Sequence, residues 1–418
     1  MSGSDEKSKK AIIFWLNGLS WPAIQNVPEV EQLAQRGART VLTSAPITGP
    51  QSHFYQVLTG KAPARFGFFD TLLPLSRLSR PSGGKSGYTV VEEHTGRDAT
   101  PPFFTELLRS AGYAAQFEEV SSDELVASVR ALAGEQDVIK LIKVSLSASD
   151  ADKQALRDAL RLAQAWVGDK GLLALLSDAQ PAPVKRFVNI NNFLADMGII
   201  ERDEQSGEIS WENSLAYFVG HGQLWINLLG RDPQGAVHPQ EEYNEVRETL
   251  IQALPAKLRD AETGEQVIER VLRKEDLYSD EYLFCAPDLV VVFKPGYAPS
   301  EQSSRLAFDK ETFTTPAAGT TAIAGMNPEQ IQGYLLVAGP AFVSGESSVE
   351  AAPLTSVAPT LLHALGVAPV DMESSATQSL FAFSFLEKHP IQSGEQSQEL
   401  SEEDEELVIN RLRDLGYI

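Results

Sequence analysis

The sequence predicts an α/β protein: a doubly wound, mainly parallel sheet with helices on both faces and an inserted smaller subdomain. Two observations predict it. Over the first 180 residues, short apolar or β-branched runs alternate with longer amphipathic stretches, which is the pattern of strand–helix–strand units. The alternation then breaks at residues 180–183, Gln-Pro-Ala-Pro, and sheet-type sequence returns only near residue 288.

The elements of the first half follow in strand–helix order. After the first strand, a helix-like segment places Val30, Leu33 and Ala34 on one face. Buried strands are expected at residues 12–16, 39–42, 137–146 and 172–176, and helices at 52–58, 103–111 and 151–167. Strands joined in this way lie parallel and are covered on both faces, and their crossovers are expected to be right-handed.

The second half of the sequence predicts an inserted subdomain followed by further elements of the core. Runs at 215–219 and 224–228 and a charged helix at 241–258 belong to the irregular part. Strands at 288–293 and 333–338 and a helix at 355–365 complete the core. We therefore predict an α/β core of residues 11–180 and 285–390, interrupted by a subdomain of residues 181–284.

The two ends of the chain are polar. Residues 1–10 are expected to be a disordered tail without an apolar signal core. Residues 391–418 are expected to be an acidic linker and a short C-terminal helix, in which Val408, Leu412 and Leu415 repeat at helical spacing. No run reaches the roughly 20 apolar residues that span a bilayer. The expected compartment is the cytoplasm.

Charge and cysteine content exclude several classes of function. With 57 acidic and 35 basic residues, the formal net charge is −22, which repels nucleic acids and anionic membranes. The single cysteine, Cys285, cannot form an internal disulfide, and its apolar surroundings indicate a buried residue. We expect a protein partner of unidentified kind.

The most specific motif lies at residues 45–50, Ala-Pro-Ile-Thr-Gly-Pro, followed by Leu-Thr-Gly at 58–60. It resembles the alkaline phosphatase superfamily, and within it the type I phosphodiesterase and nucleotide pyrophosphatase branch, where a Thr-x-Pro nucleophile turn precedes a helix ending in Thr-Gly. Further segments match that branch in its order, at residues 17–18, 176–178, 183–186 with 189–194, 226–231 with 234–235, 286–289, 358–362 and 415–417. The resemblance implies an alkaline-phosphatase-like fold in which Thr48 is the nucleophile and two metals, usually zinc, activate it.

The same resemblance implies that most of the family's metal ligands are missing from this chain. The family's first-strand aspartate corresponds to Asn17, and its Ser-Asp-His-Gly turn corresponds to Ser-Asp-Ala-Gln at 177–180, which keeps Asp178 and loses the histidine. An aspartate–histidine pair is reduced to Asp150 or Asp152, and a glycine–histidine pair corresponds to Gly-Met at 325–326. Thr48 is therefore expected to be a vestigial nucleophile, with Asn17 and Asp178 as vestigial metal positions that hold no ion.

Structural roles for these residues are open alternatives. Thr48 would then cap the following helix, Asp178 would stabilise a turn, and Asn17 would belong to an Asn-Gly turn. His53 and His221 are the histidines whose context allows a replacement ligand.

Three functions follow from this pattern. The favoured one is a catalytically inactive protein, a pseudoenzyme that serves as a binding or assembly subunit and takes no cofactor. The first alternative is a metal-dependent phosphodiesterase or phosphatase that uses Thr48 and a reduced or rearranged site for zinc or another divalent metal. The second is a sensor that binds an anionic, phosphate-containing small molecule near Thr48 without transforming it.

Overall fold

The structure is a computed structural model, and it describes residues 10–44, 50–69, 72–74, 90–92, 103–203, 205–322, 329, 331–347 and 350–391. Thr48 and residues 325–328, where the resemblance places catalytic groups, lie outside these ranges, as do both predicted terminal segments except residues 10 and 391. In the described part of the chain, no helix is long and apolar enough to cross a membrane.

Among the described residues, the main sheet has eight strands, and it confirms the predicted fold class. Its order is β20-β2-β19-β7-β1-β6-β5, and β21 also pairs with β2. β5, β6, β1 and β7 are parallel to one another, whereas β19 is antiparallel to both of its neighbours. The bounds are β1 Ala11–Asn17, β2 Ala38–Thr43, β5 Ala114–Val120, β6 Val138–Ser145, β7 Leu172–Ala179, β19 Gln332–Ala338, β20 Glu346–Ser347 and β21 Ala352–Pro353.

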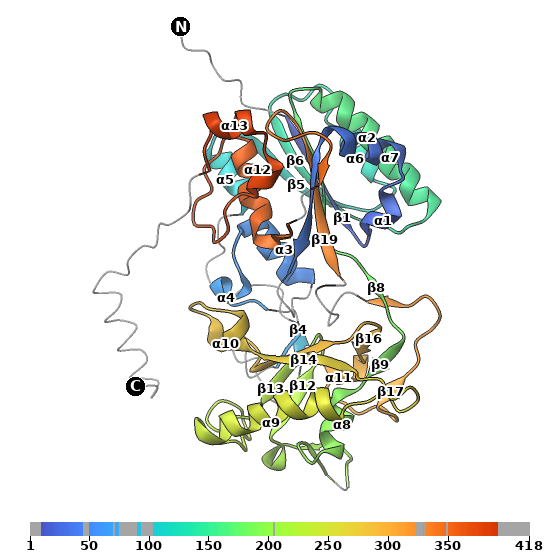
Figure 1. The fold of residues 1–418 in the computed structure, drawn as a ribbon, viewed down its shortest axis with the longest axis vertical. Coiled ribbons are helices and arrows are strands. Elements are labelled where there is room, and N and C mark those ends of the chain that lie inside the picture. The colour runs from blue at the N-terminus through green and yellow to red at the C-terminus, as the bar shows by residue number, and fades with distance from the viewer. Residues whose placement is uncertain are drawn as a thin grey trace, which may run out of the picture.

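Helices cover both faces of this sheet (Figure 1). Because side chains alternate along a strand, β1 sends Ile12 and Phe14 into one apolar cluster and Ile13 and Trp15 into another. The first cluster includes residues of α2 (Pro28–Arg36), α6 (Leu125–Arg130) and α7 (Asp150–Val167). The second includes residues of α3 (Pro50–Thr59), α5 (Phe104–Ser110) and α12 (Val357–Ala364).

A smaller, antiparallel sheet lies below the main sheet in Figure 1. Its order is β12-β13-β15-β14, and residues of α8 and α9 complete its apolar core. The bounds are α8 Ile190–Asp196, β12 Ala216–Val219, β13 Gln223–Ile226, α9 Glu241–Lys257, β14 Ile268–Arg273 and β15 Leu289–Phe293. The sequence assigned residues 288–293 to the core, but β15 pairs with β13 and β14 instead. The domain boundaries themselves remain a prediction.

Short pairings and helices complete the described structure. The pairs are β3 (Leu72–Pro74) with β4 (Val90–Glu92), β8 (Ala182–Pro183) with β18 (Thr321–Ala322), β10 (Glu201–Arg202) with β11 (Ile209–Ser210), and β9 (Arg186–Val188) with β16 (Tyr297–Pro299) and β17 (Phe313–Thr314). The short helices are α1 Trp21–Ile24, α4 Pro63–Phe66, α10 Lys274–Leu277, α11 Glu301–Ser304 and α13 Phe383–Lys388.

Candidate functional site

The carboxyl ends of parallel strands bring Asn17 and Asp178, two of the predicted site residues, to one edge of the main sheet. Asn17 is the last residue of β1, and its side-chain Nδ2 donates a hydrogen bond of 3.3 Å to the Oγ of Ser145, the last residue of β6. Asp178 lies in the adjacent strand β7, which extends three residues beyond its predicted end at Leu176. Open α/β sheets bind ligands at this edge.

Asp178 is buried in a network of side-chain hydrogen bonds. Its Oδ1 accepts a bond of 2.7 Å from Trp15 Nε1, and its Oδ2 lies 3.0 Å from His53 Nδ1. Only 6% of Asp178 is exposed, and Trp15 and His53 are exposed by 1% and 0%. Trp15 also stacks on Phe54, the neighbour of His53 in α3. The network therefore joins β1, β7 and α3 under the edge of the sheet.

The contacts of Asp178 keep its carboxyl group ionised. Burial on its own acts to raise the pKa of Asp178, but the hydrogen bond and charge of His53, with the bond from Trp15, outweigh it and hold the pKa below its usual range. An ionised carboxylate only accepts hydrogen bonds, so Nδ1 of His53 carries the proton that lies between them. The buried Nε2 of His53 has no hydrogen-bond partner in the described part of the chain.

The other histidine and aspartate candidates lie elsewhere. His221 is in the turn that joins β12 to β13, with φ of 53°. Asp152 is at the start of α7, where it accepts hydrogen bonds from Ser122 Oγ and from the backbone N–H and Oγ of Ser147. Of the two histidines singled out in the sequence, His53 is the one bonded to Asp178. Sequence spacing placed it on the helix after Thr48 but gave no sign of its partner.

The described residues do not fit a two-metal centre. Such a centre needs several carboxylates and imidazoles around each ion. Asp178 supplies one carboxylate, and both of its oxygens are already bonded. Ala179 packs in an apolar cluster with Ala182 and Val184. Within the described ranges, no group of three or more His, Cys, Asp or Glu side chains is placed to hold a metal ion.

Comparisons with known proteins find solved structures of the same fold but no match by sequence. No family model matches the chain, and no curated protein matches it by sequence. The solved structure of murine ectonucleotide pyrophosphatase/phosphodiesterase 5 matches 89% of this chain and 100% of its own with 15% identity and a TM-score of 0.57. An inactive variant of that murine protein in complex with AMP matches 89% and 100%, with 14% identity and a TM-score of 0.55.

The human ectonucleotide pyrophosphatase/phosphodiesterase 5 matches 92% of this chain and 100% of its own, with 15% identity and a TM-score of 0.54. At such identity the likeness concerns the arrangement of helices and strands. This chain therefore has the same fold as the murine and human ectonucleotide pyrophosphatase/phosphodiesterase 5 structures, which is the alkaline-phosphatase-like fold that the motifs predicted.

Proposed function

We propose that this protein is a catalytically inactive relative of the nucleotide pyrophosphatases and phosphodiesterases that acts as a binding or assembly subunit. The observation that carries the proposal is the state of Asp178. It is the carboxylate that the resemblance identifies as a retained metal ligand, and it now accepts hydrogen bonds from Trp15 and His53 inside the protein. Its role is therefore to join β7 to β1 and α3.

The electrostatics of this edge support the same proposal. A divalent cation at Asp178 would compete with two N–H donors for a carboxylate that is 94% buried. Asn17, at the end of the neighbouring strand, adds no charge, and its amide is bonded to Ser145. Displacing either donor leaves a buried polar group without a partner, which costs about 1–3 kcal/mol.

The test is elemental analysis combined with a hydrolysis assay. Protein purified with zinc and manganese present is expected to retain less than one metal per chain, and to hydrolyse aryl phosphodiesters no faster than the Thr48→Ala variant. One or two firmly bound metals per chain, with hydrolysis that disappears in Thr48→Ala, would overturn the proposal.

One observation favours an active phosphodiesterase or phosphatase as the second candidate. His53 has its Nδ1 on a carboxylate and its buried Nε2 free of described partners, and histidines that bind metals are oriented in this way by carboxylates. Under this alternative, His53 would be a ligand of a single, rearranged metal site near Thr48. Loss of bound metal and of hydrolysis in His53→Ala, with the fold retained, would establish it.

The third candidate is a sensor of a phosphate-containing ligand. The neighbour with AMP is an inactive variant, so this fold is compatible with nucleotide binding without turnover. If AMP binds here, a concentration of 100 times its Kd would stabilise the fold by about 2.7 kcal/mol. A thermal shift with AMP, but none with adenosine, would favour this function. The protein partner and the cytoplasmic location remain part of the proposal and rest on the sequence alone.

A further inference from the structure

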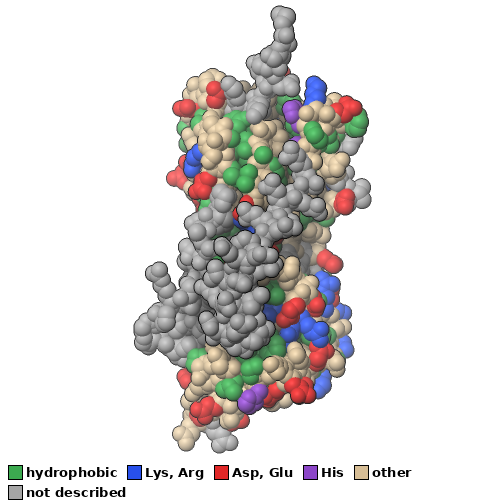
Figure 2. Space-filling model, turned by 90° about the vertical axis from the view of Figure 1, so that its left-hand side faces the viewer, with side chains coloured by type: hydrophobic (Ala, Val, Ile, Leu, Met, Phe, Trp, Pro, Cys, Tyr) green, Lys and Arg blue, Asp and Glu red, His purple; other side chains and the backbone are tan. Residues whose placement is uncertain are grey.

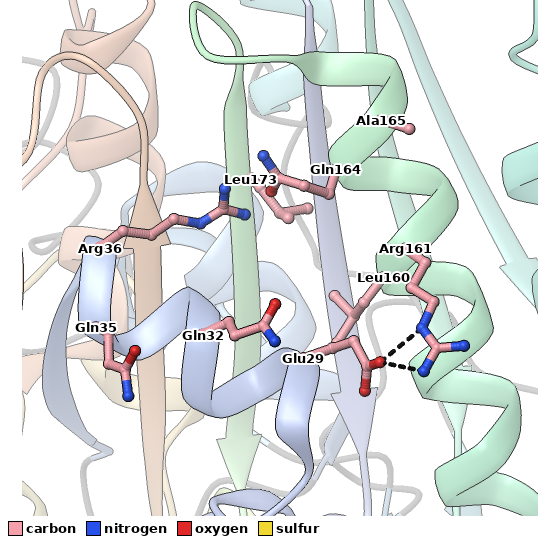
Figure 3. Close-up of a pocket in the computed structure, with 9 residues that line it drawn as sticks. All are labelled: Glu29, Gln32, Gln35, Arg36, Leu160, Arg161, Gln164, Ala165 and Leu173. Carbon is pink, nitrogen blue, oxygen red and sulfur yellow. Dashed lines mark hydrogen bonds and ion pairs between the residues drawn. The ribbon is translucent and has the colours of Figure 1, made fainter.

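Helices cover both faces of the main sheet, and side chains tie them together. On one face, Oε1 of Glu29 in α2 accepts hydrogen bonds of 2.6 Å from Nε and Nη2 of Arg161 in α7. Figure 3 shows this pair beside a pocket of about 510 Å³ between the two helices, above Leu173 of β7. Because the charge of Glu29 is paired inside the protein, this pocket needs no charged ligand. The parts of such a sheet that helices leave uncovered are its edges.

The two edges of the main sheet differ in length. One edge ends in β20 and β21, which have two residues each. The other ends in β5, which has seven residues and pairs with β6 along its whole length. Within the described ranges, no strand pairs with the other side of β5. Very short strands are a common way to close an edge, whereas a longer unpaired edge strand is a template for another chain.

Backbone groups of β5 point away from β6. Nε of Arg109 donates to the carbonyl of Ala115 at 3.0 Å, which places this carbonyl on the outer side of the strand. Because backbone groups alternate in direction along a strand, the N–H and C=O groups of Phe117 and Glu119 point outward as well. The carbonyl of Ala115 keeps a second lone pair. The outer side of β5 is therefore able to form a ladder of hydrogen bonds with a further strand.

The side chains of β5 present an apolar centre between paired charges. Phe117, the middle residue of the strand, is 37% exposed, and its ring lies edge-on to that of Phe54, with centroids 5.6 Å apart. Glu118 and Glu119 pair with lysines of β6, at 2.6 and 3.2 Å. An exposed aromatic ring at the centre of an unpaired edge is suited to contact with another strand.

From these features we propose that β5 pairs with β5 of a second copy of this chain, antiparallel and with Phe117 on the two-fold axis. In this register Phe117 faces the partner's Phe117, Glu119 faces the partner's Ala115, and Glu118 faces the partner's Gln116. The outward-pointing residues then exchange both backbone hydrogen bonds with the residues opposite. No two carboxylates lie directly opposite each other, and facing aromatic rings stabilise an antiparallel pair.

The self-complementary register favours a second copy over an unrelated extended peptide, because a two-fold interface needs the same surface on both sides. One strand from each chain gives a small contact, so the dimer is expected to be reversible, with a dissociation constant of about 1–100 μM. The contact gives the proposed assembly role a surface but does not depend on the loss of catalysis. Metal analysis tests that loss, whereas the oligomeric state tests this inference.

Sedimentation velocity of the full chain over a range of concentrations tests the dimer. The wild type is expected to associate reversibly. Phe117→Glu and Phe117→Arg are each expected to weaken the association at least about tenfold, because they place like charges on the axis. An equal mixture of the two variants is expected to recover a dimer, since residue 117 then faces the opposite charge.

Phe383→Glu is the matched control for these variants, because Phe383 is 75% exposed on α13, outside β5. It is expected to associate like the wild type. Circular dichroism checks that each variant folds. A chain that stays monomeric up to about 1 mM, or a dimer that the substitutions of Phe117 leave unchanged, overturns the proposal.

Disulfide formation between chains tests the register. Residues that face each other in an antiparallel pair have Cα atoms about 4.5–5.5 Å apart, which is within the span of a disulfide. Phe117→Cys is therefore expected to cross-link two chains on mild oxidation. Gln116→Cys is the matched control, because Gln116 is exposed on the same strand but faces a different residue of the other copy. Cys285 is buried and common to both variants. Equal cross-linking of the two variants would contradict this register.

Discussion

At the residue scale, the side chains that surround Asp178 determine its role. The sequence allowed Asp178 to be either a vestigial metal ligand or a residue that stabilises a turn. The structure places it inside strand β7 rather than in a turn, with its two oxygens bonded to side chains from β1 and α3. A carboxylate held in this way stabilises the junction of three elements, provided that both donors stay in place.

His53→Ala is expected to lower the free energy of unfolding by about 3 kcal/mol, because it leaves a buried carboxylate with one donor fewer. Urea denaturation followed by circular dichroism measures the change. His238→Ala is the matched control, since His238 is exposed and surface substitutions stay within about 0.5 kcal/mol. Equal, small losses in the two variants would show that the bond between His53 and Asp178 adds no stability.

At the element scale, two segments that matched the family prove to contact each other. Arg231, which follows β13, donates through Nη1 and Nη2 to Oδ1 and Oδ2 of Asp288, at 2.7 and 2.6 Å. The backbone N–H of Ile226 donates to the same carboxylate at 2.8 Å. Burial acts to lower the pKa of Arg231, but Asp288 outweighs it and raises the pKa. These motifs therefore hold β13 against the residue before β15, which is a structural role.

The start of α7 is a second element-scale feature. Ser149 caps the helix by accepting a hydrogen bond from the backbone N–H of Asp152. The carboxylate of Asp152 accepts hydrogen bonds from Ser122 and Ser147. The hydroxyl groups of Ser122 and Ser147, followed by the N–H of Ser147, lower the pKa of Asp152 to about 2. A carboxylate at this end also interacts favourably with the helix dipole.

Asp152→Asn is expected to reduce stability by about 1 kcal/mol at pH 7, because it weakens the charge-assisted hydrogen bonds from Ser122 and Ser147. Because the folded pKa lies below the unfolded value, this contribution is complete above about pH 4 and is lost as the pH falls toward 2. Denaturation curves between about pH 1.5 and about pH 7, a range that includes both the folded and the unfolded pKa, measure it. Asp150→Asn, which removes a neighbouring acid of the same first turn, is the control. A pH-independent difference would contradict the assignment.

At the scale of the whole molecule, a small apolar cluster joins the main sheet's helices to the smaller sheet. Ala64 and Phe69, in and just after α4, pack with Tyr278, Cys285 and Ala286. Around it, the N–H of Tyr282 donates to the carbonyl of Ala64 at 3.0 Å, and Arg65 pairs with Asp280. Cys285 is buried, as predicted. The space-filling view in Figure 2 shows the two parts in one elongated body.

Gly67→Ala is expected to weaken this connection. Gly67 has φ of +69°, and an added Cβ would lie 3.1 Å from the Tyr282 ring. Gly198→Ala is the matched control, because Gly198 has φ of +72° with no neighbour within 4 Å. The left-handed backbone is expected to destabilise both variants by about 1–2 kcal/mol, and crowding is expected to destabilise Gly67→Ala by roughly 1 kcal/mol more. As a second measurement, Gly67→Ala is expected to be cleaved by proteases faster than Gly198→Ala between the main-sheet part and the smaller-sheet part. Equal effects of the two substitutions would argue against the tight contact.

The sequence by itself determined most of the main sheet and its helices, though not β5 or α6, because apolar periodicity reports which side of an element is buried. The strand at 12–16 is β1, and the helix at 151–167 is α7 within one residue. It also determined the likeness in fold, since an ordered series of motifs survives where overall identity is only 15%. Both are properties of local runs of residues.

Only the tertiary structure decided which distant residues meet. Residues 288–293 have the composition of a core strand, yet β15 pairs with β13 and β14, because an apolar run specifies burial without specifying its neighbour. The bond between His53 and Asp178 spans 125 positions, and the pocket between α2 and α7 unites residues 29–36 with 160–173. Such contacts follow from the packing of whole elements, which local sequence patterns do not encode.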